Sequence, residues 1–134
     1  MFHALWPKES RAAHARDVRA TLGGNPRTTL PLVVFVAEAS ARLVGFAEVG
    51  LRSHADGCDA RRPVGYLEGW YVERGWRKRG IGRQLVAMAA KWCRAKGARE
   101  IASDTWATNR GSVTAHCALG FEVVDRVVNF RRAL

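Results

Sequence analysis

The sequence lacks several features that would assign it directly to a class of protein. Its three cysteines, Cys58, Cys93 and Cys117, are odd in number and have no C-x-x-C spacing, which argues against a disulfide framework and a zinc site. We expect them to be small buried hydrophobic residues. No apolar run approaches the roughly 20 residues of a membrane span, and the N-terminus lacks a basic-then-apolar signal layout. These absences predict a cytoplasmic protein with no metal and no membrane partner.

The composition is that of one ordinary globular domain, residues 1–134, with 48% hydrophobic and 25% charged residues. A formal net charge of +10 raises nucleic acid as a partner, because clustered Lys and Arg neutralise phosphates. The basic residues are scattered, however, and a polyanionic cofactor explains the densest cluster equally well. We therefore expect no nucleic-acid partner, and a pure nucleic-acid-binding module is the non-enzyme alternative.

Apolar periodicity predicts alternating helices and strands along the chain. Ser10 is a candidate N-cap of the first helix, which stops at the Gly23-Gly24-Asn25-Pro26 run. The first two strands are joined by a short polar turn around Ser40 and predict a hairpin. The expected order is α-β-β-β-α-β-α-β-β, with helices at residues 10–22, 81–96 and 111–119 and strands at residues 32–37, 43–51, 64–72, 100–104, 121–124 and 127–132.

The most informative segment is the glycine-containing basic turn, residues 77–82, between the strand 64–72 and the helix 81–96. A turn with few Cβ atoms at a helix N-terminus can bind a phosphate through backbone N–H groups, and Arg77, Lys78, Arg79 and Arg83 add positive charge. The turn lacks the Lys-Ser/Thr ending of a P-loop and has two of the three glycines of the dinucleotide motif. It therefore predicts a phosphorylated carrier other than a nucleotide undergoing hydrolysis or hydride transfer.

These residues resemble the GNAT acyl-CoA N-acetyltransferases across nearly the whole chain. The turn is similar to that family's pyrophosphate site, and Asn109, Ser112, His116 and Gly120-Phe121 match the spacing of its second acetyl-CoA motif. The strings Leu-Glu-Gly-Trp-Tyr-Val at 67–72 and Ala-Ser-Asp-Thr at 102–105 resemble the aminoglycoside 6′-N-acetyltransferase branch. The resemblance implies that acetyl-CoA binds to Trp70, Tyr71, Val72, Arg77, Lys78, Arg79, Gly80, Ile81, Gly82, Arg83, Asn109, Ser112 and His116.

The fold implied by the resemblance is α/β (α+β): a twisted mixed sheet, mostly antiparallel and flanked by helices. Two adjacent parallel strands, residues 64–72 and 100–104, would splay apart, and acetyl-CoA would enter between them. Compared with the branch, the first strand is missing, so that residues 32–37 become an apolar edge strand. A shortened chain, or a homodimer that covers this edge, would account for the difference.

The resemblance implies direct attack of an aminoglycoside amine, the 6′-amine, on acetyl-CoA, a reaction that causes antibiotic resistance. Glu68 is the candidate base that accepts the proton of the ammonium, directly or through water. Backbone N–H groups of residues 70–72 would bond the carbonyl oxygen as it gains negative charge. His116 stands where the family commonly has a tyrosine; it could act as an acid toward the thiolate, or it could simply pack against the cofactor.

A cationic acceptor requires a locally acidic pocket in a protein of charge +10. Acidic and aromatic side chains near the two branch-like strings could provide it, although Asp56 and Asp59 could equally be turn formers beside Gly57. The candidate acceptor-binding residues are Tyr66, Glu68, Asp104, Trp106, Asp56 and Asp59. A polyamine, a protein N-terminus or a lysine would use the same cofactor residues, and these acceptors are the alternative.

Overall fold

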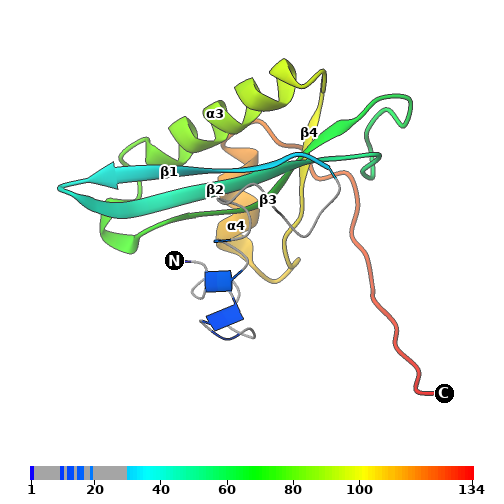
Figure 1. Cartoon of the computed structure of the whole chain (residues 1–134). Coiled ribbons are helices and arrows are strands. Elements are labelled where there is room, and N and C mark those ends of the chain that lie inside the picture. Colours follow the sequence, from blue (N-terminus) through cyan, green and yellow to red (C-terminus); the bar gives the residue numbers. More distant parts are fainter. Residues whose placement is uncertain (2–9, 11, 14, 17–18, 20–29) are drawn as a thin grey trace. The chain divides into compact units, whose positions relative to one another are not determined.

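The computed structural model describes Met1, Ser10, residues 12–13, 15–16, 19 and 30–134, and it forms two compact units, residues 1–104 and 105–134. The first unit contains a four-stranded sheet in the order β1-β2-β3-β4 (Figure 1). The first three strands are antiparallel, and β4 is parallel to β3. This confirms the predicted mixed, mostly antiparallel sheet. The strands are β1 Leu32–Ala39, β2 Arg42–Arg52, β3 Val64–Val72 and β4 Ile101–Ser103.

Strands β1 and β2 form the predicted hairpin. Its two connecting residues, Ser40 and Ala41, both have positive φ angles of 51° and 58°. Two consecutive residues in this region are typical of a type I′ turn, whose twist matches that of the strands. Strand β1 is at the edge of the described sheet, and Val36 and Leu43 near this edge are 54% and 49% exposed.

Strand β3 carries an irregularity that matters for the site. Glu48 and Val49 are consecutive on β2, but they pair with Gly69 and Leu67 on β3, so that Glu68 is the extra residue of a β-bulge. A bulge bends its strand and changes the direction of the side chains around it. The residue predicted to be the catalytic base therefore occupies the one position of β3 at which its pairing with β2 is interrupted.

The parallel pair separates after three residues. Strand β4 pairs only with residues 65–67 of β3, where the Ser103 hydroxyl also donates to the Leu67 carbonyl oxygen over 3.0 Å. Beyond Leu67, β3 continues for five residues with no paired strand on its β4 side among the described residues. The parallel pair implied by the family resemblance is present, and its pairing ends at Leu67.

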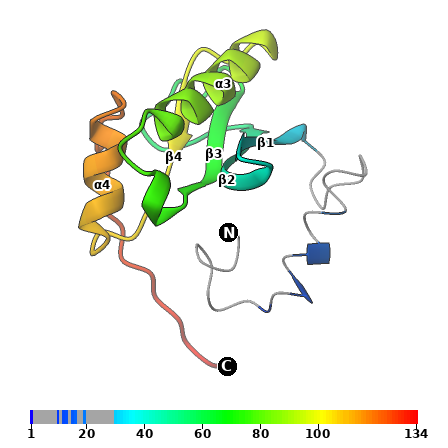
Figure 2. The same cartoon turned by 90° about the vertical axis from the view of Figure 1, so that its left-hand side faces the viewer.

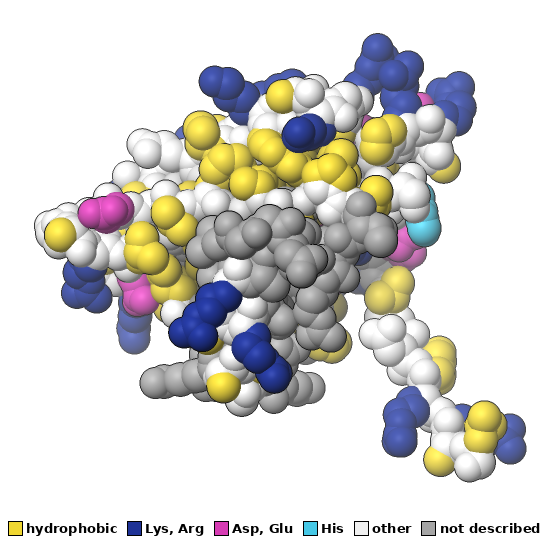
Figure 3. Space-filling view, in the orientation of Figure 1, with side chains coloured by type: hydrophobic (Ala, Val, Ile, Leu, Met, Phe, Trp, Pro, Cys, Tyr) yellow, Lys and Arg dark blue, Asp and Glu magenta, His cyan; other side chains and the backbone are white. Residues whose placement is uncertain are grey.

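Helix α3 (Ile81–Ala95) follows a short 3₁₀ helix, η1 (Arg74–Trp76), and packs on one face of the sheet (Figure 2). Hydrophobic side chains gather where this helix meets the sheet, and Lys and Arg side chains project around them (Figure 3). A Cβ at Gly65 would collide with Cys93 on α3, so this strand approaches the helix too closely for any other residue. The buried core consists of Val44, Phe46, Ala47, Val49, Val64, Tyr66, Leu67, Val72, Leu85, Val86, Ala89, Cys93 and Ala98.

The predicted role of the cysteines is confirmed for one of them only. Cys93 is buried in the core, Cys58 is half-buried, and Cys117 is exposed, which contradicts the expectation. Cys117 is the last residue of a short helix that has no buried residue, so its side chain is not packed in a hydrophobic core. All three are free thiols.

Part of the predicted first helix lies within the described residues. Residues 12–13, 15–16 and 19 are helical, and the Ala13 N–H donates to the Ser10 hydroxyl over 3.1 Å, as an N-cap requires. The rest of the predicted segment 10–22, and the Leu5-Trp6-Pro7 segment, lie outside the described residues. None of the helices in the described part of the chain is long and apolar enough to cross a membrane.

The second unit contains helix α4 (Arg110–Cys117) and the C-terminal segment. The two strands expected at residues 121–124 and 127–132 are wrong: residues 121–134, all of them described, belong to no strand. Val123, Val127 and Phe130 are 56%, 70% and 93% exposed. Their β-propensity is high, but a strand requires a paired edge and a packed face, and propensity alone supplies neither.

Candidate functional site

Four polar side chains of the first unit form a chain of contacts: Glu68 with Arg52, Arg52 with Tyr66, and Tyr66 with Asp104. Arg52 donates from Nε and Nη2 to the two carboxylate oxygens of Glu68 at 3.0 and 2.6 Å. The Arg52 guanidinium carbon also lies 3.3 Å from the centre of the Tyr66 ring, and the Tyr66 hydroxyl donates to Asp104 over 2.9 Å. The structure therefore brings together Glu68, Tyr66 and Asp104, three of the predicted acceptor-binding residues, through an arginine that was not predicted.

The sheet explains how Arg52 reaches Glu68. Gly50 pairs with Tyr66, and Arg52 pairs with Val64, two residues further from the bulge. A Cβ at Gly50 would lie 3.0 Å from the Leu32 side chain, 3.3 Å from the Pro31 carbonyl oxygen and 3.9 Å from a Glu68 oxygen, so the backbone at Gly50 is closely covered by its neighbours. Sequence reasoning missed Arg52 because its contact depends on the β2-β3 register and on the bulge. The sequence feature that could have pointed to Arg52 was an arginine at the end of an apolar strand.

Tyr66 is a neutral hydrogen-bond donor at ordinary pH. Burial, followed by the hydrogen bond to the Asp104 carboxylate, raises its pKa to about 12. Its side chain connects β3 to Asp104, the residue that directly follows β4. The phenol therefore fixes the Asp104 carboxylate beside the Arg52–Glu68 pair.

We expect Tyr66→Phe to lower the free energy of unfolding by about 1 kcal/mol below pH 10, because one hydrogen bond to a carboxylate is lost. The folded-state pKa of about 12 is above the ordinary value of 10.0, so the contribution is complete below pH 10 and is lost as pH rises through 12. Urea unfolding of both proteins between pH 8 and 11 measures this. A difference that does not shrink above pH 10 would contradict the role, and Tyr71→Phe is the control.

The predicted pyrophosphate turn has a backbone suited to an anion. Lys78 and Gly80 have positive φ angles of 60° and 82°, and Gly80 is the N-cap of α3. Such alternation directs successive N–H groups to one side, and the first helical turn adds N–H groups without intrahelical partners. Two basic side chains of this turn contact neighbouring protein groups. The Arg77 side chain donates to the Val72 carbonyl oxygen over 2.8 Å, and the Arg79 guanidinium lies over the Trp76 ring.

The start of α3 is also packed closely against β3. A Cβ at Gly82 would be 2.7 Å from the Trp70 ring, so the glycine allows the helix to begin directly beside the aromatic ring. Ile81, which is half-buried, and the exposed Arg83 flank Gly82 in this first turn. The turn and the unpaired side of β3 therefore adjoin each other within the first unit.

In the second unit, the predicted cofactor residues form a capped helix. The Asn109 side chain accepts from the Ser112 N–H over 3.1 Å as the N-cap of α4. His116 Nδ1 is 2.8 Å from the Ser112 carbonyl oxygen, and the ring packs edge-on against Phe121. A carbonyl can only accept, so Nδ1 carries a proton. A neutral His116 then presents an acceptor at Nε2, and only the imidazolium could donate from there.

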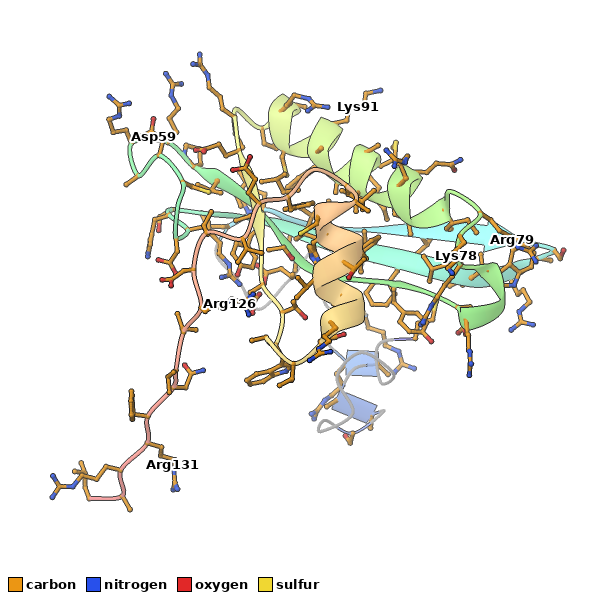
Figure 4. The ribbon with its side chains drawn as sticks, turned by 180° about the vertical axis from the view of Figure 1, so that it is seen from behind. Asp59, Lys78, Arg79, Lys91, Arg126 and Arg131 are labelled. Carbon is orange, nitrogen blue, oxygen red and sulfur yellow. The ribbon has the colours of Figure 1, made fainter. Side chains whose placement is uncertain are left out.

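The other three predicted acceptor residues are Asp59, Asp56 and Trp106, and each has its own local surroundings. Asp59 accepts from the Arg61 backbone N–H and side chain, and these hydrogen bonds lower the pKa of Asp59. Asp59 lies at the opposite end of the first unit from Lys78 and Arg79 (Figure 4). Asp56 is in a turn beside Gly57, whose φ is 74°. Trp106 belongs to the second unit and is 72% exposed.

The chain is similar in sequence to known proteins over most of its length. The model of the acetyltransferase (GNAT) family matches residues 1–121. Aminoglycoside N(6′)-acetyltransferase type 1 of Klebsiella aerogenes is 39% identical over 97% of this chain and 84% of the relative. The enzyme of that name from Stenotrophomonas maltophilia is 47% identical over 75% of this chain and 67% of the relative.

A solved structure extends the similarity to three dimensions. The structure of AAC(6′)-Iy in complex with the bisubstrate analogue CoA-S-monomethyl-acetylneamine has a TM-score of 0.86 and 37% sequence identity. It covers 100% of this chain and 88% of that chain. The fold is that of an acyl-transferring enzyme. The chain belongs to the GNAT acetyltransferase family.

Proposed function

We propose that this protein transfers the acetyl group of acetyl-CoA to the 6′-amine of an aminoglycoside, and that it thereby confers antibiotic resistance. The observation that carries the proposal is similarity over 96–98% of the chain to several aminoglycoside N(6′)-acetyltransferases. The arrangement of Glu68, Tyr66 and Asp104 supports it, because two carboxylates beside an aromatic ring suit a polycationic sugar.

Acetyl-CoA fits the residues present. The positive φ angles at Lys78 and Gly80 form a cradle that a pyrophosphate can fill, and the N-terminus of α3 favours negative charge. Beyond the end of the described β3-β4 pairing, backbone groups of residues 70–72 would bond the pantetheine amides and the thioester carbonyl oxygen. Within the second unit, Asn109, Ser112 and His116 have the spacing of the family's second acetyl-CoA motif.

The chemistry requires a neutral amine. Glu68 would accept a proton from the ammonium, directly or through water, and Asp104 would hold a neighbouring cationic group of the acceptor. The amine nitrogen then attacks the carbonyl carbon, a C–N bond forms, and the C–S bond breaks to release a thiolate. His116 could supply the thiolate's proton only as an imidazolium, because its Nδ1 already donates to Ser112.

Two further properties accompany the proposal. A cytoplasmic location would give the enzyme access to acetyl-CoA. A homodimer would cover an apolar edge, and the exposure of Val36 on β1, the edge strand of the described sheet, supports one.

The test is thiol release from acetyl-CoA with kanamycin, tobramycin, gentamicin, spermidine and a lysine-containing peptide as acceptors. We expect turnover with tobramycin that disappears with a 6′-blocked analogue. Thiol release only with spermidine or the peptide would contradict the aminoglycoside proposal and favour the alternative acceptors. Because acetyl-CoA is present throughout, the same panel tests the identity of the acceptor separately from the use of the cofactor.

A further inference from the structure

Arg52 makes, within the first unit, the contacts that a cationic acceptor needs. Its guanidinium donates to both oxygens of Glu68 and lies 3.3 Å from the centre of the Tyr66 ring. Partial burial opposes its charge, but the hydrogen bond to Glu68 and the charges of Glu68 and Asp104 raise the pKa of Arg52. An ammonium group would be attracted to the same two carboxylates and the same ring face.

The contact between Arg52 and Glu68 is exposed enough for another cation to replace the guanidinium. The Arg52 side chain is 44% exposed and that of Glu68 is 29% exposed, so water can replace the contact when the guanidinium leaves. Partly exposed ion pairs contribute little net free energy because solvent compensates for their loss.

We propose that Arg52 is a specificity-determining residue: it occupies the ammonium-binding position between Glu68 and Tyr66 until a polycationic acceptor displaces it. The inference rests on the proposed function, because it assigns Glu68 and Asp104 to the acceptor. A monoamine can replace only the Glu68 contact, whereas a polyamine can bind Glu68 and Asp104 together. Arg52 therefore selects against simple amines, and it leaves Glu68 only when the acceptor supplies the ammonium that replaces it.

Arg52→Gln tests the proposal. Removing the competing guanidinium should lower KM for tobramycin about fivefold to tenfold, with kcat within about twofold and KM for acetyl-CoA unchanged, as expected when only ground-state acceptor binding changes. The variant should also accept the monoamine ethylamine better than the wild type does. An unchanged or raised KM for tobramycin would overturn the proposal, because it would mean that Arg52 supports the acceptor or only the fold.

Arg42→Gln is the matched control, because it removes the same charge from the other end of β2, at an exposed position. A similar fall in KM in this control would show a general effect of net charge and would also overturn the proposal. Arg52→Lys keeps the charge but loses the two-pronged geometry, so its KM should lie between those of the wild type and Arg52→Gln.

A measurement on the wild-type protein covers the case in which Arg52→Gln does not fold. The Arg52 Nε–H resonance, assigned by its absence in Arg52→Lys, should shift when tobramycin is added without acetyl-CoA. Saturable tobramycin binding without such a shift would overturn the displacement. If the wild type acetylates no aminoglycoside, the proposed acceptor is wrong, and the same titration with spermidine then decides whether Arg52 is displaced by polycations.

Discussion

We expect Glu68→Gln to reduce kcat/KM for the aminoglycoside about 100-fold to 1,000-fold, the range typical for loss of a general base. Glutamine has the same shape and can still accept from Arg52, but it cannot take a proton from the attacking ammonium. KM for acetyl-CoA should remain within about twofold, because Glu68 lies on the acceptor side of the reaction. Steady-state thiol release with each substrate varied in turn measures both quantities.

Two companion variants make this result specific. Asp104→Asn should raise KM for the acceptor about tenfold with a smaller effect on kcat, because Asp104 binds a cationic group and takes no proton. Glu38→Gln removes the same charge from the exposed part of β1 and should leave all constants unchanged. Equal loss of acetyl-CoA affinity in the Glu68 and Asp104 variants would contradict both assigned roles.

The order of elements and the central sheet could be predicted because local patterns determine them. The strand Val64–Val72 was predicted with its observed bounds, and the hairpin and helix α3 within two residues at each end. Apolar periodicity and the glycines at the two ends of α3 act over a few residues, so the sequence shows them directly. The parallel β3-β4 pair followed from the family resemblance, since strand pairing is not local.

The missed features depend on contacts between distant residues. Arg52 lies sixteen residues from Glu68, and its contact requires both the β2-β3 register and the bulge at Glu68. The prediction of two C-terminal strands was wrong for a related reason: a valine-rich run indicates β-propensity, but it does not show whether a neighbouring strand is available for pairing. The roles of Glu68, Asp104 and His116 remain predictions, although the structure places Glu68 and Asp104 around one tyrosine.

The second large effect is expected at the pyrophosphate turn. Gly80→Val should weaken CoA binding about 30-fold to 100-fold, because a β-branched residue resists the φ of 82° that aligns the N–H groups of the turn. A Cβ there would meet no neighbouring atom within 4 Å among the described residues, so a loss of CoA affinity would come from the backbone and from the space that the phosphates need. Calorimetric titration with CoA alone, at fixed ionic strength, measures it.

Gly97→Val separates this effect from a loss of stability. Gly97 ends the same helix with a φ of 89°, and a Cβ there also meets nothing within 4 Å. Both variants therefore carry a similar backbone strain of about 1–2 kcal/mol, and their thermal unfolding should shift by similar amounts. Only Gly80 is at the N-terminal end of α3, where N–H groups and the helix dipole attract an anion. Equal CoA affinities in the two variants would mean that the phosphates bind elsewhere, and that this turn does no more than start the helix.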